Sequence, residues 1–131
     1  MKKNCLLIIF LLAFVSIGFS NTDSIPARVN DVSSIDSIVK ALYNVISGPA
    51  GESRNWDRMR TLFMPGANMI PTGIKNDGKP HSKIIDLETY ITVIGPQLVK
   101  VGFFETEIGR KTEQFGNLVH VFSSYESRNR K

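Results

Sequence analysis

The chain has 131 residues, one cysteine, and 16 Lys and Arg against 12 Asp and Glu, for a formal net charge of +4. This length predicts one domain, because two separate cores could not both be filled. The charge excess is small and aromatic residues are not interleaved with the basic ones, which argues against a nucleic-acid partner.

The first twenty residues have the pattern of a secretory signal. Lys2 and Lys3 precede an apolar run from Cys5 to Phe19, and Ser20 suits the −1 position of a signal peptidase site. The run is shorter than the roughly 20 residues that a membrane-spanning helix needs. We therefore predict cleavage after Ser20 and export to the periplasm or the outside, with no membrane attachment afterwards. An uncleaved signal anchor is the alternative.

Cleavage would change what chemistry is possible. It removes Cys5, so the exported protein could form no disulfide and present no thiolate. It also removes Lys2 and Lys3, which leaves 14 Lys and Arg against 12 Asp and Glu, a net charge of +2. Residues 21–33 are polar and carry Pro26, which predicts a linker, and residues 34–131 form the predicted domain.

Three helices are predicted in the first part of this domain. Apolar residues recur at helical spacing from Ile35 to Ile46, with Ser33 or Ser34 as N-cap and Gly48 as a stop. A shorter helix begins at Trp56, capped near Ser53 or Asn55, and ends at Pro65-Gly66; it should pair with the first. A third begins at Asp86, is kinked or restarted at Pro96, and closes at Gly102.

Strands are predicted mainly after Gly102. Asn68 to Pro71 is a short strand candidate, and residues 72–83 read as a polar loop with an Asp77-Gly78 turn. Phe103 to Lys111 and Leu118 to Tyr125 are rich in β-formers and predict a long hairpin. The second of these runs does not alternate cleanly between apolar and polar residues, so we expect both of its faces to be covered, one by helices and the other by another sheet or subunit.

The stretches NWDRMRTLFMPGANMIP and GFFETEIGRKTEQFGNLVHVFSSYESR, in this order of elements, resemble the nuclear transport factor 2-like superfamily, and more closely its small exported bacterial members of unassigned activity. The resemblance covers Ile35 to about Arg128. It implies an α+β fold in which a cone-like, curved antiparallel sheet packs on the three N-terminal helices, encloses a pocket and often dimerises through its outer face. Family members continue with two further strands, so we expect the domain to be incomplete at its C-terminus.

Enzymes of this superfamily carry a carboxylate or a histidine in the pocket as general acid or base, so the resemblance makes Asp57 and His120 the catalytic candidates. An apolar wall at Trp56 would favour the protonated form of Asp57, whereas the structural alternative is a helix first-turn charge paired with an arginine. A two-residue loop would place His120 on one face with Glu105, Glu107 and Glu113, and a longer loop would separate them. The predicted pocket-lining residues are Tyr43, Trp56, Phe63, Met69, Tyr90 and Phe122.

No cofactor or metal is predicted. There is no GxGxxG or P-loop, and His81 and His120 lie in different elements without a metal-binding spacing. We therefore expect an exported domain with a pocket for a small, largely apolar molecule, its reaction unassigned, that forms a homodimer. The alternative is a non-catalytic interaction or dimerisation domain that uses its outer sheet face.

Overall fold

The protein is described here by a computed structural model that covers residues 26–129. The predicted signal peptide, the first part of the linker and the last two residues lie outside this range. In chain order the elements are α1 (Val29–Val32), α2 (Ile35–Ile46), α3 (Trp56–Arg60), β1 (Asn68–Met69), β2 (Thr72–Ile74), β3 (Pro80–Ser82), β4 (Ile85–Asp86), α4 (Leu87–Thr89), η1 (Tyr90–Ile94), α5 (Gly95–Val101), β5 (Phe103–Phe115) and β6 (Leu118–Asn129).

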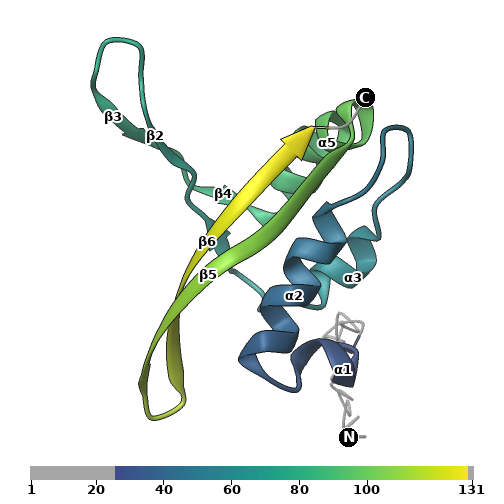
Figure 1. The fold of residues 1–131 in the computed structure, drawn as a ribbon, viewed down its shortest axis with the longest axis vertical. Coiled ribbons are helices and arrows are strands. Elements are labelled where there is room, and N and C mark those ends of the chain that lie inside the picture. Colours follow the sequence, from purple (N-terminus) through teal and green to yellow (C-terminus); the bar gives the residue numbers. More distant parts are fainter. Residues whose placement is uncertain (1–25, 130–131) are drawn as a thin grey trace, which may run out of the picture.

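The fold is α+β, as predicted, with helices beside small antiparallel sheets (Figure 1). Within the described range the strands form three separate antiparallel pairs, β1 with β4, β2 with β3, and β5 with β6. The long β5–β6 hairpin crosses the molecule, α2 lies alongside β5, and β6 lies on the far side of β5 from α2. In residues 26–129 no helix has both the length and the apolar character needed to cross a membrane.

The predicted helix α2 is confirmed with its cap. Ser34 is the N-cap, and its hydroxyl oxygen accepts a hydrogen bond of 3.0 Å from the backbone N–H of Ser37. One face of α2 buries Val45 and Ile46, which pack with Met59 of α3 and Ile91 of η1 into the main core. Met59 is only 1% exposed, so this helix pair holds the centre of the domain.

The third predicted helix is also present, but one turn of it is widened. Asp86 caps it, with its carboxylate accepting the N–H of Thr89 at 2.6 Å, and Gly102 closes it with a positive φ of 68°. Between them, η1 is a π-helical turn that ends at Ile94, two residues before Pro96. Proline has no N–H to donate to the preceding turn, which accounts for irregular hydrogen bonding here.

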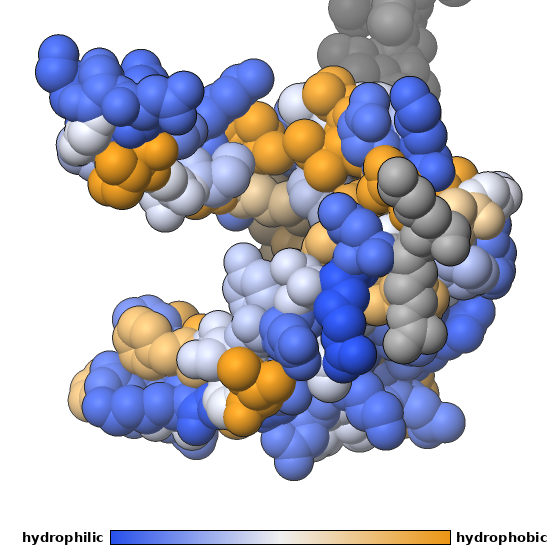
Figure 2. Space-filling view, turned by 45° about the horizontal axis from the view of Figure 1, so that its top comes forward, coloured by the Kyte–Doolittle hydropathy of each residue, from blue (hydrophilic) through white to orange (hydrophobic). Residues whose placement is uncertain are grey.

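Two stretches that were predicted to be irregular carry structure. The linker contains α1, where buried Asp31 accepts a bidentate pair from Arg58 with N–O distances of 2.7 and 2.8 Å. The expected polar loop 72–83 is the β2–β3 hairpin, which turns at Gly78 with φ 79°. It projects from the body as a separate lobe, with open space between it and the far end of β5–β6 (Figure 2).

Buried Arg54 joins the end of α2 to α5. Its guanidinium donates to five backbone carbonyls, at distances of 2.6 to 3.3 Å, those of Ile46, Gly48, Pro49, Glu52 and Leu98. Gly48 in turn exchanges two backbone hydrogen bonds with Phe103, the first residue of β5. This junction fixes where β5 starts relative to α2, and so it positions the inner wall of the hairpin.

The expectation that both faces of β6 are covered is wrong for a single chain. Helix α2 packs on β5, while on β6 Leu118 is 61%, Phe122 56% and Tyr125 55% exposed. The physical reason is that the hairpin has only two strands, so the helices cover the strand nearest to them and leave the other open.

Candidate functional site

Two faces of the β5–β6 hairpin must be distinguished. The inner face is the one directed at α2, because Ser123 of β6 shares a hydrogen bond of 2.8 Å with Tyr43 of α2. It carries Glu105, Glu107 and Arg110 from β5. Side chains alternate along a strand, so the outer face carries His120 and Phe122.

Of the two loop lengths left open by the sequence, the two-residue loop is present, but it does not bring His120 to all three glutamates. Phe115 pairs with Leu118 across Gly116-Asn117, and Glu113 therefore lies directly opposite His120. The register then shifts between Glu107 and Gly109, so that Ile108 is an extra residue in β5. A β-bulge of this kind moves later side chains to the other face. Glu105 and Glu107 are consequently on the inner face, and His120 stays exposed on the outer face.

Asp57 does not lie at a cavity either. It is exposed on α3 and forms an ion pair with Arg60, with an N–O distance of 2.7 Å. This is the structural alternative raised from the sequence. The second histidine of the chain, His81, lies on β3 opposite Gly73. In the described part of the chain, no three His, Cys, Asp or Glu side chains gather as a metal site would require.

An apolar cavity of about 320 Å³ lies between α2, α3 and the hairpin. Four of the six residues predicted to line a pocket line it together, Tyr43, Phe63, Met69 and Tyr90, and they are joined by Leu42, Ile46, Met59, Glu105 and Tyr125. Trp56 packs instead against the main core and Gly95, and Phe122 lies on the outer face. The floor of this cavity is the core cluster itself, which explains its apolar character.

A second hollow, of about 450 Å³, adjoins the apolar cavity on the side of β5. We call it the polar hollow because its lining includes the charged or polar side chains of Asp36, Lys40, Asn44, Glu107 and Arg110. Tyr43 and Glu105 line both hollows. These two side chains therefore stand where an apolar space meets a polar one.

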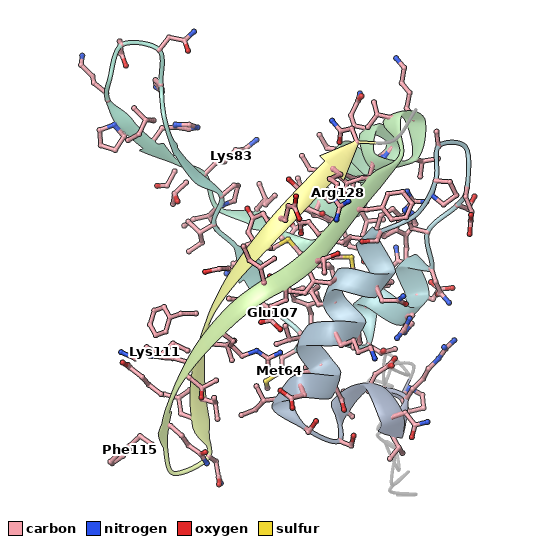
Figure 3. The ribbon with its side chains drawn as sticks, viewed as in Figure 1. Met64, Lys83, Glu107, Lys111, Phe115 and Arg128 are labelled. Carbon is pink, nitrogen blue, oxygen red and sulfur yellow. The ribbon has the colours of Figure 1, made fainter. Side chains whose placement is uncertain are left out.

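The polar hollow is held by a chain of hydrogen bonds across three elements. The Arg110 guanidinium donates to Glu107 at 2.6 and 2.8 Å and to Asp36 of α2, and the Ser123 hydroxyl donates to Glu107 at 2.6 Å. The Arg110 hydrogen bonds lower the pKa of Glu107 to about 2, with a further contribution from Ser123. Figure 3 shows Glu107 between β5 and α2. Both oxygens of its carboxylate accept hydrogen bonds from Arg110, which also neutralises its charge.

Glu105 differs from Glu107 in having no such partners. Its backbone N–H is fixed by the Ser47 hydroxyl at 2.9 Å, yet among the described residues its carboxylate has neither a hydrogen bond nor an ion pair. Burial raises the pKa of Glu105. Burial, and then the negative charge of Glu105, also raise the pKa of Tyr90. A carboxyl group in this setting can accept a hydrogen bond from a ligand, or exchange a proton with it.

The sequence treated Glu105 only as a partner of His120, not as a site residue. The signal that points to it is its position two residues after Phe103, at the start of a strand that packs on a helix. No signal in the sequence indicates the bulge at Ile108, which places Glu105 and His120 on opposite faces of the hairpin.

No protein-family model matches this chain, and no curated protein or solved structure is similar enough to count as a match. The candidate site therefore rests on its own geometry.

Proposed function

We propose that the protein is an exported domain whose apolar cavity binds a small, largely apolar molecule carrying one hydrogen-bond donor, with Glu105 as the acceptor. The observation that carries this proposal is a half-buried carboxylate that has no hydrogen-bond or ion-pair partner among residues 26–129, set in an apolar wall beside Tyr43 and Tyr90. The volume of about 320 Å³ lies at the lower end of the roughly 300–1,000 Å³ of ligand pockets, so the ligand is small.

Two features of the sequence support a wider assignment. The signal-like pattern of residues 1–20 favours export. The order of elements and the two stretches quoted for the resemblance favour a nuclear transport factor 2-like domain, in which the hairpin would belong to a larger, cone-like sheet. In that family a pocket carboxylate can act as general acid or base, and Glu105 takes this role in our proposal in place of Asp57 and His120. We assign no reaction.

Charge complementarity defines the class of ligand. An anionic ligand would be repelled by the ionised Glu105 carboxylate, whereas an O–H or N–H donor would satisfy it. Since the folded-state pKa of Glu105 is raised, the carboxylate becomes protonated at a higher pH than an ordinary glutamate. Binding of a neutral donor should therefore weaken as the pH falls through this raised pKa.

The experiment uses three probes with the same ring system. The full chain is expressed in a host that exports it, the N-terminus of the recovered protein is read by mass spectrometry, and unfolding is followed by thermal shift. Ligands that bind only the folded state raise its stability in proportion to the logarithm of their concentration. We expect 2-naphthol, which has one O–H donor, to raise the midpoint more than naphthalene, and naphthalene-2-sulfonate to leave it unchanged.

Glu113 supplies a matched control, because it is an exposed glutamate on the outer face of the same strand. Glu105→Gln should reduce the advantage of 2-naphthol over naphthalene and remove its pH dependence, and Glu113→Gln should change neither. If no probe stabilises the protein, or if the two substitutions act alike, the proposal is wrong.

A further inference from the structure

Within residues 26–129, no strand pairs with the outer edge of β6. The strand pairs with β5 alone, and α2 contacts it from the inner face through Tyr43. An unpaired edge presents a row of free N–H and C=O groups that can pair with another strand. A hairpin of only two strands is also marginally stable in water, which makes such pairing favourable.

The two strands of the hairpin differ in how their edges are protected. Natural edge strands avoid pairing through charged residues, prolines and bulges. β5 has several of these devices, the bulge at Ile108 and the charged side chains of Glu105, Glu107, Arg110, Lys111 and Glu113. In contrast, residues 118–125 of β6 contain no Lys, Arg, Asp, Glu or Pro, and the bulge is not on this strand.

We propose that β6 pairs antiparallel with β6 of a second copy of this chain, so that two hairpins join into one four-stranded sheet. This inference does not rest on the ligand proposal, because it is argued from the backbone edge of β6, although Tyr125 of this strand also lines the apolar cavity. Leu118 and Phe122 on the outer face and Tyr125 on the inner face are more than half exposed in a single chain, and the pairing would place cross-strand neighbours beside them.

The backbone limits the possible registers. Every second residue of β6 directs its backbone N–H and C=O groups toward the unpaired edge. In an antiparallel pair, such a residue lies opposite a residue of the second strand that also directs its N–H and C=O groups toward the shared edge. The two outer faces therefore lie on the same side of the joined sheet. The remaining choice is which residue lies at the twofold axis.

Hydrogen-bond complementarity favours an axis at Ser123. In this register residues 118–128 overlap, His120 lies opposite Glu126 of the second copy, and Val121 lies opposite Tyr125, each pair occurring twice. An imidazole N–H can donate a hydrogen bond to the carboxylate opposite it, and an aromatic residue facing a β-branched one also stabilises a cross-strand pair. Moving the axis to Ser124 would place His120 opposite Arg128, and moving it to Phe122 would leave Glu126 opposite Leu118. Neither alternative places the imidazole opposite a carboxylate.

Sedimentation of the exported protein tests the pairing. We expect the mass to double with rising concentration, since the buried apolar side chains and new backbone hydrogen bonds stabilise the joined sheet. A protein that stays monomeric at all accessible concentrations would overturn the proposal.

Cysteine cross-linking tests the register. Residues that face each other in antiparallel strands have Cα atoms about 4.5–5.5 Å apart, which lies within the range of a disulfide, whereas diagonal neighbours at about 7–8 Å do not. We would mix a His120→Cys chain with a Glu126→Cys chain under mild oxidation. The expected product is a mixed disulfide dimer in excess over either homodimer.

Arg128→Cys is the matched control, because it places a cysteine on the same face of β6 two residues further along. Mixed with His120→Cys, it should cross-link poorly. Cross-linking of this second pair in preference to the first, or of neither pair, would refute the register at Ser123. Far-UV circular dichroism and Trp56 fluorescence would establish that each variant is folded before it is mixed.

Discussion

Arg54 provides the most direct test of how the hairpin is anchored. Its side chain is 7% exposed and has no carboxylate partner in the described range, so its charge is balanced only by backbone carbonyls. Three of its five hydrogen bonds are partly accessible to water, those to Pro49, Glu52 and Leu98. Water can replace these in part when the side chain is removed.

The two fully buried bonds set the expected cost of removing Arg54. They go to the carbonyls of Ile46 and Gly48, at 3.1 and 2.6 Å. A hydrogen bond to a charged group contributes about 1.5–3 kcal/mol, so two of them correspond to about 3–6 kcal/mol of unfolding free energy. This is a large part of the roughly 5–15 kcal/mol that stabilises an ordinary domain.

The assay is urea unfolding followed by the fluorescence of Trp56, the single tryptophan of the chain. Arg54→Met should lower the unfolding free energy by about 3–6 kcal/mol. Arg54→Lys should fall between Arg54→Met and the wild type, because an ammonium group has only three donors. Arg60→Met is the control, since Arg60 is 38% exposed in its pairs with Asp57 and Glu88 and should cost no more than about 1 kcal/mol. If Arg54→Met costs no more than Arg60→Met, the anchoring role is refuted.

Three further predictions concern single positions. In the folded protein the pKa of Glu107 is about 2, which lies below its ordinary value of 4.5, so the stability that Glu107 contributes is present above pH 4.5 and is lost as the pH falls toward 2. The urea midpoint of Glu107→Gln should therefore decline less than that of the wild type between pH 5 and pH 3. An equal decline would contradict this prediction. A Cβ at Gly95 would lie 2.8 Å from Trp56 Cζ2, so Gly95→Ala should lower the unfolding free energy by about 1–3 kcal/mol and shift the Trp56 emission. A stabilised variant with unchanged emission would contradict the close packing of Gly95 on Trp56. Gly116 has φ 56° in the hairpin loop, so Gly116→Ala should lower the unfolding free energy by about 1–2 kcal/mol in urea unfolding. Gly109→Ala is the control, because Gly109 has open space around it and no positive φ, and it should lower the unfolding free energy less. Equal losses would exclude a turn that needs glycine.

Local signals in the sequence predicted the elements well where the chain itself supplies the reason. The apolar spacing from Ile35 to Ile46, with the Ser34 cap, predicts α2 with its observed ends. Asp86 and Gly102 likewise predict the two ends of the third helix. These signals act within a few residues along the chain, so no knowledge of the packing is needed to read them.

Partners that are distant in sequence account for what was missed. α1 was predicted to be linker, and its Asp31 is held by Arg58, 27 residues away. Nothing in the local sequence marks Asp31 as half of a buried pair. Asp57, beside Arg58, looked like a pocket carboxylate but is on the surface, because the buried face of the short helix α3 belongs to Met59.

The candidate site shows the same division between local and distant information. The sequence by itself determined the α+β class, the helix caps, the hairpin though not its loop length, and an apolar residue set of which four members meet at one cavity. Only the tertiary structure decided which carboxylate joins them, because one extra residue at Ile108 turns Glu105 and Glu107 toward α2 while His120 stays outside. The physical reason is that alternation along a strand determines only whether neighbouring residues lie on the same or on opposite faces of the sheet. The bulge and the helix packed on β5 determine which residues lie on the buried face.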